Sequence, residues 1–195
     1  MLTKRINAEE IDSSLLSLGA KIKDLDPDTK VKIFSSGQKQ TVADSIINDY
    51  EQGEQIIIQG FSAGGGDVQD LSGILKNAGI KDNLITIQID SIEPLGNDAS
   101  IPDNVNKAIN VFQKESQTGL PIVDFIDDNA MNGEDKIKRS LLNFDTVIVN
   151  KEFKNIQGPS QGEPSSPHRN MDNDPRVQQF IEEQVLPAVK KQNDK

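Results

Sequence analysis

The residues Gly60-Phe61-Ser62-Ala63-Gly64 fit the pattern G-x-S-x-G. In this pattern a serine occupies a strained turn between a strand and a helix, and its hydroxyl projects clear of the sheet. Three adjacent β-branched residues, Ile56–Ile58, predict a buried strand before the turn, and a helix is expected from about Gly64 to Leu75. Both flanks therefore indicate that Ser62 is a nucleophile for acyl transfer. The alternative is a glycine-rich turn in which Ser62 is merely a small residue.

A serine nucleophile needs a general base that is neutral at the working pH. His168 is the single histidine of the chain, so it is the only imidazole that could take this role. It follows the Gly/Pro/Ser-rich stretch 158–167, which predicts a surface loop, and it precedes an expected closing helix at Pro175–Val189. The order of serine and then histidine agrees with a hydrolase triad. The alternative is a surface histidine in a loop.

The third member of a triad is a carboxylate that orients the histidine. Asp90 ends the strand expected at Leu84–Ile89, at the same edge of a parallel sheet as Ser62, and it is the preferred acid. A further strand at Pro121–Ile126 would bring other carboxylates to this edge, and one more lies close to His168 in sequence. These rival candidates are Asp124, Asp127, Asp128 and Asp172.

An oxyanion hole needs two hydrogen-bond donors. The backbone N–H of Ala63, directly after the nucleophile, is expected to supply one of them. For the second we expect Ser36, within Ser35-Ser36-Gly37, because this stretch follows an early strand predicted at Val31–Phe34. The stretch Met1–Asn7, as the remainder of a shorter first strand, is the alternative source.

Dinucleotide binding is a competing hypothesis, because a glycine turn, a helix and a strand ending in Asp90 also describe a Rossmann unit. The glycine spacing disfavours it, since Gly64-x-Gly66 should be followed by a glycine where the chain has Gln69. Asp67, in the first turn of the expected helix, would also repel a phosphate.

The alternation of strands and helices predicts an α/β fold, a three-layer sandwich with a mostly parallel sheet. We expect a single domain over residues 1–195, with a flexible tail at 190–195. The remaining expected elements are an amphipathic helix in the first 25 residues, helices at Thr41–Gln52 and Pro102–Phe112, and a strand at Thr146–Val149.

The composition excludes several classes of function. A net charge of −10 and a pI near 4.6 argue against nucleic acid as a partner. With no cysteine and one histidine, disulfides, thiolate zinc sites and His-rich metal sites are excluded, and no cofactor or metal is expected. No apolar run of about 18 residues and no signal-peptide core is visible, so a cytoplasmic location is the default expectation, with export by another route left open.

Four stretches together resemble small bacterial lipase-like or esterase-like α/β hydrolases. They are IIIQGFSAGGGDVQDLSGILKNAGI, LITIQID, IPDNVNKAINVFQ and SPHRNMDNDPRVQQFI, and the resemblance covers about Val31 to Val185. It implies an α/β-hydrolase fold with a reduced N-terminal part, and Ser62, Asp90 and His168 as nucleophile, acid and base. The implied function is hydrolysis of a carboxylic ester or related acyl bond in a small-molecule substrate.

Two further points concern the substrate and the alternative function. Aromatic residues make up only 4% of the chain, which gives no sign of a large lid over a lipid, so small or soluble acyl substrates are favoured. The brief N-terminal portion leaves a second hypothesis, a catalytically inactive hydrolase-like module that binds a ligand or a protein. The asparagines at 104, 106 and 110 are expected on the predicted helix, facing solvent or orienting nearby loops.

Overall fold

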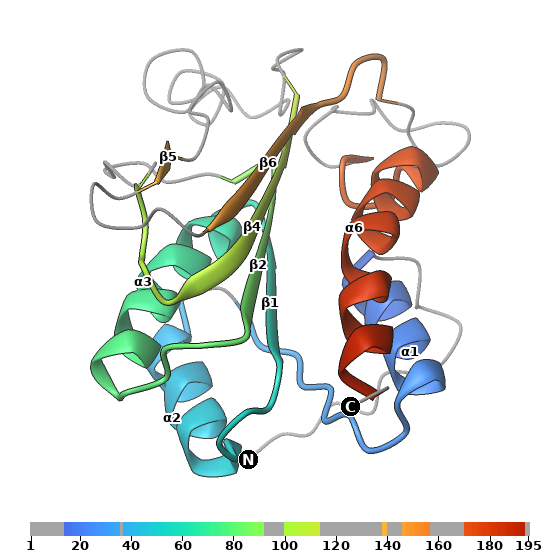
Figure 1. Ribbon diagram of the computed structural model, residues 1–195. Helices are drawn as coiled ribbons and strands as arrows, with labels where there is room; N and C mark the ends of the chain where they lie inside the picture. The colour runs from blue at the N-terminus through green and yellow to red at the C-terminus, as the bar shows by residue number, and fades with distance from the viewer. Residues whose placement is uncertain are drawn as a thin grey trace.

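The computed structural model describes residues 14–35, 37–91, 100–113, 138–139, 146–156 and 170–193. Within these ranges the chain alternates between strands and helices (Figure 1). The elements are α1 (Ser14–Leu25), α2 (Lys39–Asp49), β1 (Ile56–Phe61), α3 (Ala63–Asn77), β2 (Leu84–Ile89), β3 (Ser100–Ile101), β4 (Val105–Phe112), β5 (Lys138–Arg139), β6 (Val147–Glu152) and α6 (Pro175–Asn193).

Four strands form a parallel sheet in the order β1-β2-β4-β6, which is also their order along the chain. Parallel neighbours require a crossover, and α3 supplies it between β1 and β2. All four strands therefore end at the same edge of the sheet, which we call the carboxyl edge. β3 and β5 form a separate parallel pair of two residues each.

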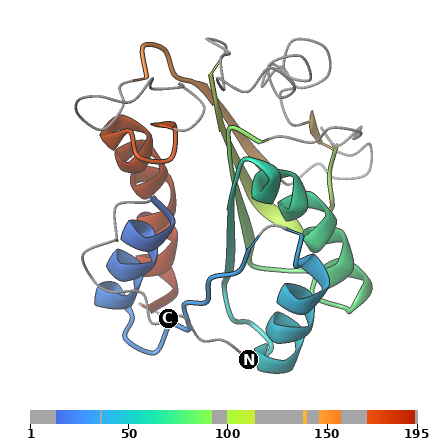
Figure 2. The same ribbon diagram turned by 180° about the vertical axis from the view of Figure 1, so that it is seen from behind.

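Helices cover both faces of the sheet, with α2 and α3 on one side and α1 and α6 on the other (Figures 1 and 2). Each face carries its own buried apolar cluster. β2 is buried along its whole length because it lies between two strands and two helix layers. The prediction of an α/β fold with a parallel sheet is thus confirmed. No helix in the described ranges is long and apolar enough to cross a membrane.

Most predicted elements are present where the sequence indicated them. The helix in the first 25 residues is α1, the helix at 41–52 is α2, the strand at 84–89 is β2, the strand at 146–149 is part of β6, and the closing helix is α6. The strand expected at Pro121–Ile126 and the loop expected at 158–167 lie outside the described residues.

The helix predicted at Pro102–Phe112 is wrong, because these residues form the central strand β4. Val105, Ile109 and Phe112 have helical spacing, and that spacing led to the prediction. A central strand is covered on both faces, however, so its apolar residues need not alternate with polar ones, and Ala108 to Phe112 are all buried.

The asparagines of this segment belong to a strand and its start instead of a helix; Asn104 is buried, whereas Asn106 is exposed, and both bind neighbouring elements. The amide Nδ2 of Asn104 donates to the carbonyl oxygens of Ser72, at 3.0 Å, and Ile80, at 3.1 Å. Asn106 Oδ1 accepts a hydrogen bond from the backbone N–H of Leu84 at 2.9 Å. These contacts fix both ends of the α3–β2 connection against β4.

The strand predicted at Val31–Phe34 is also wrong, because these residues belong to no sheet of the structure. The segment between α1 and α2 crosses from one helix layer to the other past β1 (Figure 2). Lys32 ties it to α2, donating to Ser45 Oγ at 2.8 Å and pairing with Asp49. Attachment to a helix, rather than to a strand edge, explains why the β-branched pattern did not produce a strand.

Candidate active site

Ser62 occupies a strained turn between β1 and α3. Its backbone has φ 55° and ψ −126°, a conformation that side-chain-bearing residues rarely adopt. The turn is held from both sides, because the Ser62 N–H donates to the Ile89 carbonyl at 3.0 Å and the Ser62 carbonyl accepts from the Gly65 N–H at 2.8 Å. A conformation of this kind costs about 1–3 kcal/mol and persists where the surroundings impose it, as at functional sites.

Two glycines allow this turn to form, and they are not the pair that the motif suggests. A Cβ atom at Gly60 would lie 2.1 Å from the Gly64 carbonyl oxygen, so a side chain is excluded there. A Cβ atom at Gly64 would meet no atom within 4 Å, whereas one at Gly65 would lie 2.9 Å from the Cβ of Ser91. A side chain is therefore excluded at Gly60 but has room at Gly64. Gly65, which sequence reasoning missed, takes the second close contact.

The start of α3 presents backbone donors beside the serine. The first N–H groups of a helix have no acceptor within the helix. Those of Gly65 and Gly66 are directed to the Ser62 carbonyl, at 2.8 Å and 3.4 Å. In the part of the chain that the structure describes, the N–H groups of Ala63 and Gly64 have no hydrogen-bond acceptor. The predicted donor Ala63 thus lies directly after Ser62, and Gly64 is a further donor that the sequence did not indicate.

The proposed source of a second donor after α1 is only partly described. Ser36 lies outside the described residues. On either side of it, the Ser35 N–H donates to Gln38 Oε1 at 3.1 Å, and the Gly37 N–H donates to Asp67 Oδ2 at 2.6 Å. The contact with Asp67 brings the start of α2 against the second turn of α3, but the two flanking N–H groups are already used.

Asp90 follows β2 and lies next to the serine turn, as its place in the sequence predicted. The hydrogen bond from the Ser62 N–H to Ile89 joins the ends of β1 and β2, so Asp90 and Ser62 leave adjacent strands side by side. Asp90 also has a positive φ, 42°, and only 5% of its surface is exposed. Two strained non-glycine residues therefore stand together at the carboxyl edge.

Gln113, the residue after β4, holds the carboxylate of Asp90. Its backbone N–H lies 3.3 Å from Asp90 Oδ1 and its Nε2 lies 3.2 Å from Oδ2. Neutral donors fix the orientation of a carboxylate without neutralising its charge. Sequence reasoning missed Gln113 because the segment before it was interpreted as a helix, although a polar residue directly after the apolar pair Val111-Phe112 was the available signal.

The turn that precedes α6 lies at the same end of the molecule as the carboxyl edge. His168, Asp124, Asp127 and Asp128 lie outside the described residues. Asn170, two residues after His168, begins a turn that leads into α6 at the end of the molecule where the strands of the sheet terminate (Figure 1). The alternative acid Asp172 is buried in this turn.

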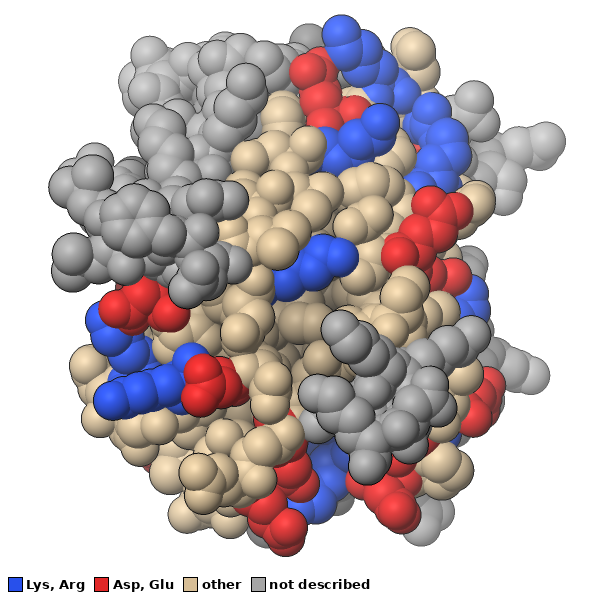
Figure 3. All heavy atoms as spheres, viewed as in Figure 1, with Lys and Arg blue, Asp and Glu red and all other residues tan. Residues whose placement is uncertain are grey.

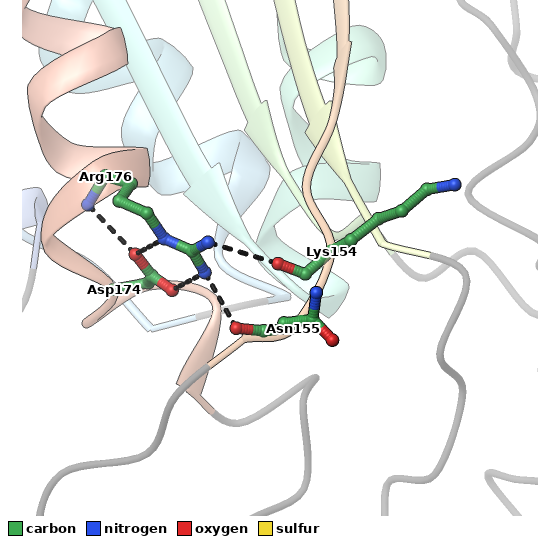
Figure 4. A network of polar contacts seen from close by, with 4 residues as sticks. All are labelled: Lys154, Asn155, Asp174 and Arg176. Atoms are coloured by element: carbon green, nitrogen blue, oxygen red, sulfur yellow. Dashed lines mark hydrogen bonds and ion pairs between the residues drawn. The ribbon is translucent and has the colours of Figure 1, made fainter.

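Asp174 and Arg176 fasten that turn to the end of β6 (Figure 4). Asp174 is the N-cap of α6, since its Oδ1 accepts the Arg176 N–H at 2.9 Å, and its Oδ2 pairs with the Arg176 guanidinium at 2.6 Å. The guanidinium donates in turn to the carbonyl oxygens of Lys154, at 3.2 Å, and Asn155, at 2.9 Å. Asn155 lies before residues 157–169 in the sequence, and Asp174 lies after them. Arg176 therefore joins the described residues on the two sides of the segment that contains His168.

The charged surface is mixed. Lys and Arg side chains are interspersed with Asp and Glu side chains on the face shown in Figure 3. Several of these charges form ion pairs, for example Lys76 with Asp103 at 2.7 Å, which lowers the pKa of the Asp103 carboxyl.

No family model matches the chain, and no curated protein or solved structure shows significant similarity to it.

Proposed function

We propose that this chain is a serine hydrolase of the α/β-hydrolase type that cleaves a carboxylic ester or a related acyl bond. The observation that supports this most directly is the backbone of Ser62, whose φ of 55° and ψ of −126° at a strand-to-helix turn are those of a residue held in strain. Strain at a serine that directly precedes a helix N-terminus has a chemical use, because it holds the hydroxyl beside donors for an oxyanion.

The reaction proposed for this site has two steps. Ser62 Oγ attacks the acyl carbon while His168 takes its proton, and His168 then returns the proton to the leaving alcohol. The N–H groups of Ala63 and Gly64 stabilise the oxyanion of each tetrahedral intermediate. Water, deprotonated by His168, releases the acid and restores Ser62.

Asp90 is the proposed acid of the triad. It would accept the second ring N–H of His168, fix the tautomer and stabilise the imidazolium. Its support is threefold: it is buried, it lies beside Ser62 on the adjacent strand, and Gln113 orients it. Asp174, by contrast, is committed to capping α6 and to Arg176.

The contacts around the first turns of α3 disfavour the dinucleotide alternative. Asp67, in the second turn of α3, accepts the Gly37 N–H, and its negative charge near the helix N-terminus disfavours a phosphate there. Gln69, which stands at the position of the missing third glycine, is buried and donates to Gln88 Oε1 at 3.3 Å. A side chain packed there prevents the close helix-to-strand approach that the glycine would permit.

A fluorophosphonate probe tests the proposal, because it labels a serine only where a base and an oxyanion hole activate it. The wild-type chain should be labelled at Ser62, and Ser62→Ala and His168→Gln should abolish labelling. Ser17→Ala, on α1, is the matched control and should leave labelling unchanged. A folded wild-type protein that is not labelled would contradict the proposal and favour a non-catalytic binding module.

Asp90→Asn then tests the acid. Loss of the carboxylate leaves the histidine in the wrong tautomer, and turnover should fall by about 10⁴-fold while the fold is kept. Asp172→Asn is the comparison. If Asp172→Asn lowers turnover and Asp90→Asn does not, the acid has been assigned to the wrong residue.

A further inference from the structure

A cavity of about 640 Å³ runs beside β1, which is an edge strand of the sheet with β2 as its neighbour. Its walls come from the segment 26–35, from α2 and from β1. Its lining includes Gly60, Phe61 and Gly64, so the cavity reaches the residues on both sides of Ser62, although Ser62 itself does not line it. We call this cavity the β1 groove. Its volume is in the range of sites that bind small molecules.

The side chains that line the β1 groove include exposed apolar ones. Val31, Ile33 and Phe34 are 41%, 51% and 36% exposed, and all three line it. The opposite wall includes Ile56 and Ile58 of β1. Because large apolar side chains gathered on a surface are costly to hydrate, such a patch marks a binding site for apolar groups.

The charges near the β1 groove do not favour an anionic ligand. Lys32 pairs with Asp49, and Lys39 pairs with Asp70 and lies 4.0 Å from Asp67. Lys32 and Lys39 are therefore already opposed by carboxylates of α2 or α3. Lys30, which also lines the groove, donates to the backbone carbonyl of Asp49 at 3.4 Å. A free carboxylate or phosphate would have to displace these partners, whereas an uncharged chain would not.

We infer that the β1 groove binds the unbranched alkyl chain of an uncharged acyl ester, with the ester carbonyl at Ser62. This inference rests on the proposed function, and it replaces the expectation of small acyl substrates. β1 has six residues and so extends over about 20 Å, which gives the groove room for a long chain. Each buried methylene raises the affinity by up to about fourfold.

Methyl alkyl ketones test the inference without catalysis, since they present an uncharged carbonyl and a chain but no cleavable bond. Tyr50 lines the groove and is the only tyrosine in a chain without tryptophan, so its intrinsic fluorescence reports on the groove itself. In the Ser62→Ala protein, affinity should rise by roughly two- to fourfold for each added methylene until the groove is filled.

Ile33→Asn should weaken binding of the longest ketone by about tenfold, because it places an amide in the apolar lining. Ile47→Asn is the matched control, since Ile47 is similarly exposed, at 39%, but lies on α2 outside the groove. Phe34→Asn serves as a second groove variant. Affinity that does not depend on chain length, or that falls equally in Ile33→Asn and Ile47→Asn, overturns the inference.

Ester hydrolysis separates failure of this inference from failure of the proposed function. Chain-length-dependent ketone binding without turnover of p-nitrophenyl esters would support the groove and refute the hydrolase. Turnover that is equal for short and long esters and unchanged in Ile33→Asn would support the hydrolase and overturn the groove. A wild-type dimer that Ile33→Asn makes monomeric would show that a second copy covers the groove, and it would also overturn the inference.

Discussion

The strain at Ser62 predicts that glycine stabilises this position more than alanine does. Ser62→Ala removes the hydroxyl but keeps a Cβ atom, so the cost of φ 55° and ψ −126° remains. Ser62→Gly removes both the hydroxyl and the strain. Both variants lose the hydroxyl and its contacts. The difference between their free energies of unfolding therefore measures the effect of the backbone conformation alone.

The expected magnitude follows from two opposing contributions. Relief of the strain gives about 1–3 kcal/mol. Glycine loses more freedom on folding than alanine, which costs about 0.4–1 kcal/mol. Ser62→Gly should thus be more stable than Ser62→Ala by roughly 1 kcal/mol, equal to about 2–4 °C in melting temperature for a chain of this size.

Equilibrium unfolding in urea, followed by far-ultraviolet circular dichroism, measures this difference. The control is the same pair of substitutions at Ser45, in the middle of α2, where the order should reverse because glycine is about 1 kcal/mol less favourable than alanine in a helix. Both Ser45 variants lose the same contact with Lys32, so that contact cancels. If alanine is the more stable residue at both positions, Ser62 is not strained as described.

Three further predictions concern stability. Gly60→Ala should destabilise the protein by several kcal/mol, because its Cβ would lie 2.1 Å from a backbone oxygen, whereas Gly64→Ala should be tolerated; the two midpoints of urea unfolding check this. Asp174→Ala should cost about 1–2 kcal/mol through loss of the α6 cap, and equal midpoints for the variant and the wild type would contradict that role. The hydrogen bond from Lys32 lowers the pKa of the Asp49 carboxyl from 3.8. The ionised carboxylate of Asp49 therefore stabilises the fold above pH 3.8, and this stabilisation is lost as the pH falls through the lowered pKa. Asp49→Asn should accordingly lower the melting temperature at about pH 7 but leave it unchanged near pH 2.

The sequence predicted the fold best where local pattern and tertiary environment agree. The serine turn lies between an apolar β-branched run and a glycine-rich helix start, and β1, α3 and β2 are all where the pattern indicated them. The pattern was misleading for β4, because a strand buried on both faces has no alternation to read. The helical spacing of Val105 and Ile109 there is a coincidence in a strand that mixes apolar and polar residues.

The candidate site could be predicted in its residue types but not in its supporting contacts. Ser62 and Asp90 were identified from what stands next to them in the chain. Gln113 and Gly65 were not, because their roles depend on which strands are neighbours: Gln113 reaches Asp90 across β4 and β2, and Gly65 approaches Ser91 across α3 and β2. Such contacts arise from the order of strands in the sheet, which local pattern does not contain.

The strand order of the sheet, β1-β2-β4-β6, bears on how the protein is made. Among the described strands of this sheet, each one after β1 pairs with a neighbour that has already left the ribosome, so these strands can be added in the direction of synthesis. The strained residues of the candidate site, Ser62 and Asp90, belong to the first βαβ unit and the turn that follows it. Nascent chains can therefore assemble the strained turn before β4, β6 and α6 emerge.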